Sequence, residues 1–262
     1  MRWPRSVAGF AIVFAINLLV FAANSSLVVA ETWMPTAVGN EWKYRITETA
    51  EYAIGGQAVS QESKSGRYLR EITKQGQHAN VPVPVFVFEE VRKWTGDHED
   101  GRTTSLGALR RGAFVEFALD TGKGLSLHQN PLIYVPASVK GGMSWKVGTL
   151  ELNGLMVEMQ GKILGLQAAR TPVGAFERCL KVRYTGALSG MIELDDGRLP
   201  VRNGQMDMTH WFAPGVGLVM AEETVRMDLL TAQGTMTSTL TDHYALERFQ
   251  VDGAPVPAQQ AP

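Results

Sequence analysis

Apolar and polar side chains alternate along most of this chain, and the alternating runs are separated by short turns rich in glycine. The clearest run begins at Trp42, where Trp42, Tyr44 and Ile46 share one parity and Lys43 and Arg45 take the other. Successive side chains of a β-strand point to opposite faces of the sheet. The run therefore predicts a strand with one buried face and one wet face.

Glu48 is a charge on the otherwise apolar parity of this run, which indicates a bend or a sheet rim at that point. Gly55-Gly56 then turns the chain. The strongest turn signal is Asn153-Gly154 between two alternating runs, because Asn-Gly accepts the positive φ of tight hairpins. Similar breaks separate later runs: Asp195-Asp196-Gly197, Asn203-Gly204, Pro214-Gly215 and Gln233-Gly234.

Two other runs make specific predictions. The segment Val85-Phe86-Val87-Phe88 is apolar on both parities, so we expect a strand that is covered on both faces. Further along, four apolar residues alternate with two acidic ones, which predicts an inward apolar face and a wet acidic face: Ala113, Val115, Phe117 and Leu119 against Glu116 and Asp120.

The whole pattern predicts an all-β protein. After the first thirty residues, no window keeps apolar residues at helical spacing over the roughly 10 to 12 residues that a helix prediction needs. The connections are also too short for parallel crossovers. We expect roughly a dozen antiparallel strands in a meander that forms a strongly curved sheet or an incomplete barrel, with a β-sandwich as the alternative.

The N-terminal segment has the features of an export signal. Arg2 and Arg5 precede an apolar run from Val7 to Ala23, and Val28 and Ala30 suit the −3 and −1 positions of a signal peptidase site. We therefore expect a signal peptide over residues 1–30, one β domain over residues 31–250 and a disordered tail, rich in Pro, Ala and Gln, over residues 251–262. Retention of the apolar run as a membrane anchor is the alternative, since its length falls only slightly short of a membrane span.

The net charge limits the classes of partner that we expect, and the cysteine content bears on the cellular compartment. The net charge of −1 gives no basic footprint for nucleic acid, and loss of Arg2 and Arg5 makes the mature chain slightly more acidic. Cys179, the one cysteine, cannot form an internal disulfide. A secreted or periplasmic protein of this size can rely on its core instead. We expect no nucleic-acid partner and no stable membrane anchor after cleavage.

Four stretches together resemble a known family: Val38-Gly39-Asn40-Glu41-Trp42, Pro131-Leu132-Ile133 through Gly142-Met143-Ser144-Trp145, Thr171-Pro172-Val173-Gly174-Ala175-Phe176, and Trp211-Phe212-Ala213-Pro214-Gly215-Val216-Gly217-Leu218-Val219. They are similar to the TapB-like family of bacterial envelope proteins, which is distantly similar to periplasmic lipoprotein carriers. Those carriers are half-open barrels that hold acyl chains under a helical lid. This sequence has no lid helix, and its shared residues are turn and core residues, which indicate a fold more than an activity.

No catalytic motif is present. The chain has neither His-Glu-x-x-His nor Gly-x-Ser-x-Gly, and no helix for a phosphate-binding loop. Folding could bring His210 and His243 to Asp207 or Asp242, which keeps a hydrolase as one alternative. Asp97, Glu99 and Asp100 are too few ligands for calcium, and Cys179 has no catalytic partner nearby in sequence. We expect neither an enzyme nor a cofactor or metal.

Methionine is unusually frequent in the last predicted strands, where it occurs at Met206, Met208, Met220 and Met236. Methionine fills irregular core gaps and also lines surfaces that adapt to apolar ligands. We predict an exported, non-enzymatic periplasmic binding or interaction module whose partner is an apolar small molecule or an envelope protein. A carrier of a lipid-like ligand, bound at these four methionines, and a hydrolase are the alternatives.

Overall fold

The computed structural model describes residues 33–96, 98–152, 154–194, 197–231 and 234–252. None of these residues forms a helix with the length and apolarity that a membrane crossing takes. They form twelve β-strands: β1 (Glu41–Ile54), β2 (Gln57–Gly76), β3 (Val85–Trp94), β4 (Gly101–Arg110), β5 (Ala113–Asp120), β6 (Ser126–Val135), β7 (Ser144–Leu152), β8 (Leu155–Thr171), β9 (Gly174–Leu194), β10 (Gly197–Ala213), β11 (Gly217–Thr231) and β12 (Gly234–Gln250).

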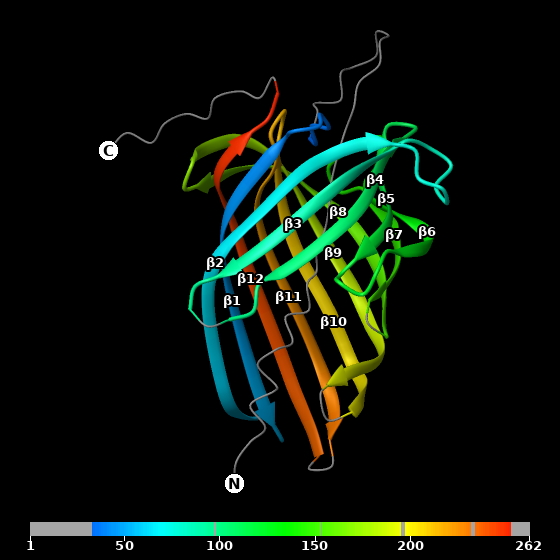
Figure 1. The fold of residues 1–262 in the computed structure, drawn as a ribbon. Helices are drawn as coiled ribbons and strands as arrows, with labels where there is room; N and C mark the ends of the chain where they lie inside the picture. Colours follow the sequence, from blue (N-terminus) through cyan, green and yellow to red (C-terminus); the bar gives the residue numbers. More distant parts are fainter. Residues whose placement is uncertain (1–32, 97, 153, 195–196, 232–233, 253–262) are drawn as a thin grey trace.

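The strands form one antiparallel sheet in the order β6-β5-β4-β3-β2-β1-β12-β11-β10-β9-β8-β7. The sheet curls until its two outer strands, β6 and β7, lie near each other (Figure 1). The Trp145 Nε1 donates to the Ile133 carbonyl across this gap at 2.7 Å, but no backbone ladder joins the described residues of β6 and β7. The molecule is thus a nearly closed barrel with one unsealed seam, which confirms the predicted antiparallel meander and excludes the sandwich.

Strand β1 has the predicted orientation. Trp42, Tyr44 and Ile46 are buried in the barrel, whereas Arg45 is exposed. The indole of Trp42 donates to the Val216 carbonyl at 2.6 Å, and the Tyr44 hydroxyl donates to the Leu218 carbonyl at 2.8 Å. These buried bonds satisfy the polar tips of two aromatic side chains inside the core.

The predicted double-sided strand is also confirmed. Phe86 and Phe88 belong to the core that fills the barrel, whereas Val85 and Val87 belong to a second, smaller cluster. That cluster also contains Val81 from the connection before β3, together with residues of β4 and β5. The β2–β3 connection therefore packs apolar side chains against this wall of the barrel.

The predicted orientation of β5 is wrong. Val115 and Phe117 belong to the smaller cluster, and Glu116 is fully buried next to His128 of β6. The β2–β3 connection covers the apolar side chains of this face, and register irregularities occur with both neighbouring strands. A β-bulge adds a residue to one strand and shifts the parity of the residues after it, so Leu119 returns to the barrel core.

The predicted turns that lie wholly within the described residues occur with one exception, while Asp195, Asp196 and Gln233 of two further turns lie outside them. Gly154 and Gly215 adopt φ values of 84° and 69°, as the β7–β8 hairpin and the β10–β11 turn require. Asn203-Gly204 is not a turn but an irregularity inside β10, where Asn203 takes a φ of 47°. Asparagine tolerates this left-handed conformation, so the same dipeptide suits a bulge.

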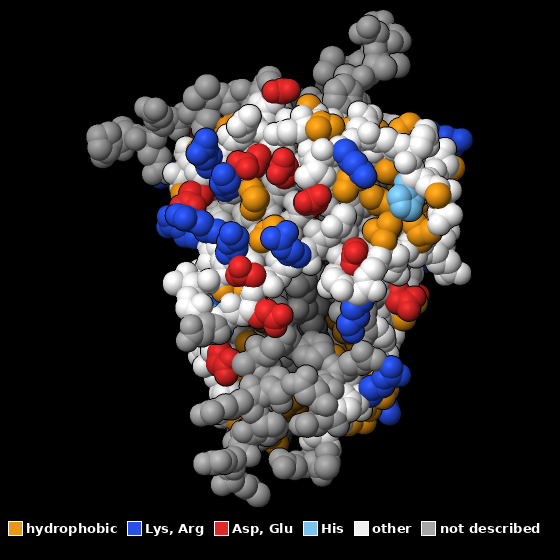
Figure 2. Space-filling model, viewed as in Figure 1, with side chains coloured by type: hydrophobic (Ala, Val, Ile, Leu, Met, Phe, Trp, Pro, Cys, Tyr) orange, Lys and Arg blue, Asp and Glu red, His pale blue; other side chains and the backbone are white. Residues whose placement is uncertain are grey.

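Several predicted features lie outside the described residues: the signal peptide over residues 1–30, most of the tail, Asp97 and Asn153. Of the tail, Val251 packs against the core and the Asp252 amide donates to Asn40 Oδ1 at 3.2 Å. Lys and Arg alternate with Asp and Glu over the upper face in Figure 2, while hydrophobic side chains gather on the side of β5 and β6. This face therefore has no single-sign charge field.

Candidate functional site

The inner wall of the barrel carries buried ionisable side chains, each acid beside a base. We call these residues the ion-pair belt: Lys64 with Glu48 at 2.7 Å, Arg70 with Glu90 at 3.5 Å, Arg92 with Asp242 at 3.2 Å, His128 with Glu116 at 2.9 Å, and His210 with Glu223 at 2.9 Å. Charges removed from water are tolerated when they are paired and hydrogen-bonded. The belt therefore forms a polar zone within an otherwise apolar core.

The strand register brings the acids of the belt together. Glu48 lies opposite Asp242 in the β1–β12 ladder, and Asp242 lies opposite Glu223 in the β11–β12 ladder. Arg92 reaches these residues from β3 and donates both to Asp242 and to the Tyr244 hydroxyl. Three neighbouring carboxylates repel one another, so the cations at Arg92 and Lys64 are needed to hold this arrangement together.

Burial shifts the protonation of the belt. It raises the pKa of Glu90 to about 7, although the Arg70 guanidinium acts in the opposite direction. Burial also raises the pKa of Glu48, against the hydrogen bond from Lys64. Burial alone would lower the pKa of Arg92, but its neighbours Tyr244 and Asp242 hold that pKa above its ordinary value.

The structure brings together only some of the sequence candidates for acid and base chemistry. His210 is fully buried against Glu223 and its ring lies 5.1 Å from that of Tyr184, measured between centroids. Asp242 lies on the same inner wall, but His243 is exposed. Asp207 forms a surface ion pair with Arg183. Within the described residues, no group of three or more His, Cys, Asp or Glu side chains is placed to hold a metal ion.

Glu223 was missed as a candidate, although the sequence carries a signal for it. It shares its parity on β11 with Ala221, Val225 and Met227, all of which are buried. Glu48 shows the same signal on β1, where a rim was expected and the side chain is instead buried beside Lys64. A charge on an apolar parity thus marks the belt on both strands.

The four predicted ligand-binding methionines do not share one surface. Met206 and Met208 are buried in the barrel core, and Met236 lies on the inner parity of β12. Met220 lies on the opposite parity of β11, the same as exposed Glu222. The structure therefore brings Met206, Met208 and Met236 to the inner wall and places Met220 on the outer one. Binding of a ligand by these methionines stays a prediction.

Cys179 is fully buried, and its thiol donates to the Phe176 carbonyl at 3.7 Å. Burial raises the pKa of Cys179 to about 12. A thiol with so high a pKa forms almost no thiolate near neutral pH, and the thiolate is the reactive species. Cys179 thus packs as a small apolar side chain.

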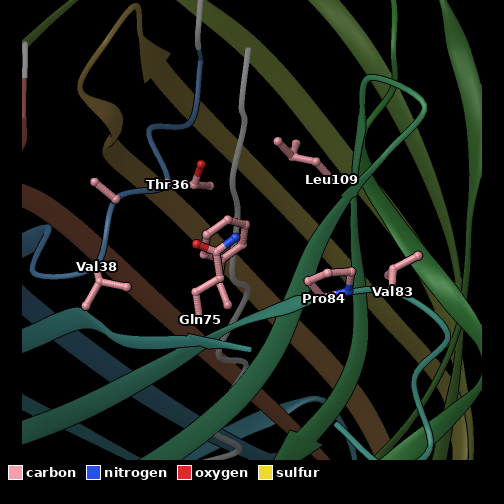
Figure 3. A pocket seen from close by; sticks show the side chains of 8 residues that line it. Thr36, Val38, Gln75, Val83, Pro84 and Leu109 are labelled. Atoms are coloured by element: carbon pink, nitrogen blue, oxygen red, sulfur yellow. The ribbon is translucent and has the colours of Figure 1, made fainter. Parts of the chain in front are cut away.

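A pocket of about 580 Å³, the rim pocket, lies where β3 begins and β4 ends. Thr36 and Val38 come from the segment before β1 and face Leu109, Val83 and Pro84 across the space (Figure 3). The remaining lining residues are Ala37, Gln75 and Phe86. Small-molecule sites have volumes of about 300 to 1,000 Å³ and mostly apolar walls with a few polar groups. The rim pocket has these properties, and no sequence pattern indicates it because its walls come from four separate segments.

No family model matches the chain, and no curated protein matches it. A solved structure from Bacteroides fragilis, described as a candidate exported protein with a YmcC-like fold, has 13% sequence identity and a TM-score of 0.39. The similarity covers 82% of this chain and 97% of that one.

Proposed function

We propose that this chain is an exported, non-enzymatic binding module that holds an apolar small molecule in the rim pocket. The observation that carries the proposal is the pocket itself, with its volume of about 580 Å³ and its mostly apolar wall. Val38 at the rim is 52% exposed, and an apolar ligand would cover it. Each methylene group that leaves water contributes about 0.8 kcal/mol to binding.

A lipid-like ligand fits this pocket better than a charged one. Its polar lining residues, Thr36 and Gln75, are neutral, and Phe86 connects the pocket to the barrel core. The same core contains Met206 and Met208, whose flexible side chains adapt to varied apolar shapes. We propose that the protein acts in the periplasm, because residues 1–30 contain a positively charged start, an apolar run and a cleavage motif.

A binding role is favoured over hydrolysis because the acid and base groups are enclosed. His210 is fully buried and Glu223 nearly so. Within the described part of the chain, neither side chain lines the rim pocket. A general base must come within hydrogen-bond reach of its substrate.

The test is a titration of the purified protein with Nile red, a neutral dye that fluoresces in apolar sites. Val38→Asp and Leu109→Asp should each weaken dye binding by about tenfold, because a carboxylate in the wall loses its hydration when the dye binds. Leu230→Asp is the matched control, since Leu230 is exposed and does not line the pocket. Equal binding by all four proteins would refute the rim pocket as the site, and native mass spectrometry of protein from the envelope fraction should show a co-purifying lipid.

A further inference from the structure

Strand β8 extends beyond its outer neighbour. The β7–β8 ladder ends at the pair Ser144 and Lys162. Beyond it, the Gly142 amide donates to the Ile163 carbonyl, and the Ile163 amide donates to the Met143 carbonyl. From Leu164 to Thr171, β8 pairs with β9 alone within the described ranges. This stretch is therefore an exposed sheet edge, whose outward backbone groups can pair with another chain.

The exposed edge of β8 carries apolar side chains, whereas a second exposed edge, in β2, carries mostly polar ones. Leu164 and Leu166 have exposed fractions of 44% and 52%. In β2, Gln57–Lys64 likewise pairs with β1 only, but most of its side chains are polar and Lys64 points inward to Glu48. Inward charges and polar side chains are devices that protect edges from pairing. The edge of β8 has two leucines instead.

Basic side chains surround these leucines. Lys162 and Arg170 are exposed before and after them on β8. Arg183 lies opposite Lys162 on β9, where its charge is paired with that of Asp207. Lys181 lies opposite Gly165, between the two leucines. The whole chain has a net charge of −1, so this basic group is a local feature that favours an acidic partner.

We propose that the β8 edge, comprising Leu164–Arg170 and its basic neighbours, binds an extended acidic protein segment that carries apolar side chains. The segment adds a short strand beside β8, covers Leu164 and Leu166, and places its carboxylates near Lys162 and Arg170. A second copy of this chain fits less well. Antiparallel self-pairing centred on Leu166 would set Lys162 opposite Arg170, and like charges directly opposite destabilise a strand pair.

The register irregularities at Ile163/Gly165 and Gln167/Ala169 limit the length of the added strand. A bulge breaks the regular spacing of ladder hydrogen bonds, so pairing is confined to a few residues. Affinity then depends on the two leucines and on charge rather than on a long ladder. Such a surface suits a reversible contact with a segment of another envelope protein.

The test uses a fluorescein-labelled peptide of alternating glutamate and leucine, and a matched peptide with lysine in place of glutamate. Fluorescence anisotropy should show binding of the acidic peptide about tenfold tighter than that of the basic one, with a marked loss in high salt. The Leu164→Ser/Leu166→Ser double variant and Lys162→Glu should each weaken binding by about tenfold. Met156→Ser is the control, because Met156 is an exposed residue of β8 within the part paired to β7.

Amide hydrogen exchange locates the contact. Bound peptide should slow exchange in residues 164–170 and leave the exposed edge of β2 unchanged. Equal affinity for both peptides, or unchanged binding by the leucine double variant when its circular dichroism is native, would overturn the proposal. Binding to vesicles of anionic phospholipid without binding to the acidic peptide would also overturn it, and would assign the surface to a membrane.

Discussion

Ile46 and Arg45 are neighbours in β1 with opposite environments, the first buried in the barrel and the second exposed. Ile46→Ala should destabilise the protein by about 2 to 5 kcal/mol, because it leaves a cavity in a packed core. Arg45→Ala should change the free energy of unfolding by about 0.5 kcal/mol or less, since its contact with Glu247 is a surface ion pair at 3.5 Å. Urea denaturation of both variants provides the measurement, and similar losses would contradict the inward orientation of Ile46.

Glu90 should make stability depend on pH. Its pKa is raised to about 7 by burial, above the ordinary value of 4.5. The folded state therefore holds this proton through a range where the unfolded chain has released it. Stability from this group is present below about pH 4.5 and is lost as the pH rises towards 7, at up to about 1.4 kcal/mol per pH unit.

Glu90→Gln should remove this part of the pH dependence, because glutamine cannot titrate. Glu89→Gln is the control, since Glu89 is the exposed neighbour on the same strand. Urea denaturation between pH 5 and pH 8 compares the three proteins. A wild-type profile that matches Glu90→Gln would show that Glu90 is already ionised in the folded protein at pH 5.

The sequence pattern predicts the environment of some side chains but not of others. The alternation around Trp42 and Tyr44 gives their orientation directly, since the extra residue of the nearby irregularity, Glu247, lies in β12 and leaves the parity of β1 unchanged. Glu223 is detectable as a charge on an apolar parity. Glu116 is not, because the connection before β3 covers the opposite face of β5 and leaves Glu116 on the inner wall beside His128.

At the scale of elements, the seam between β6 and β7 depends on Trp145. Its indole N–H donates to the Ile133 carbonyl, a bond that a phenylalanine cannot make. Trp145→Phe should cost about 1 kcal/mol and speed amide exchange in Ser126–Val135. Trp42→Phe also loses an indole bond, to the Val216 carbonyl, but should leave exchange in that strand unchanged. Equal acceleration by both variants would mean that the seam has no separate stability.

Element lengths were predicted less well than element types. Strand β2 spans Gln57–Gly76 and β9 spans Gly174–Leu194, so both extend well beyond any alternating run. Both longer strands contain polar or glycine-rich stretches without clear alternation. Such stretches become strands because a neighbour supplies the ladder, and a single-sequence pattern does not include the neighbour.

At the scale of the whole molecule, export makes a direct prediction for the N-terminus. Removal of residues 1–30 after Ala30 should leave Glu31 as the first residue. N-terminal sequencing of protein from the envelope fraction tests this. An intact Met1 on a membrane-bound product would support the anchor alternative instead.

The curled antiparallel meander was predictable because it follows from short connections and alternating runs. The closure was not, because the pairing of β1 with β12 joins the two ends of the chain. Alternation shows which face of a strand is buried but carries no information on which edges meet. The rim pocket was hidden for a related reason, since its walls come from four separate segments whose arrangement alternation does not reveal.

The pairing of β12 with both β1 and β11 has a consequence for how the chain is made. Strands β1 to β6 form one half of the sheet and β7 to β11 form the other, and β12 is the only strand paired to both halves among the described residues. It is also the last of them to leave the ribosome. Until then, both halves present open edges, and closing so distant a contact is entropically costly and slow. The two halves of the sheet can therefore be joined only after β12 has been synthesised.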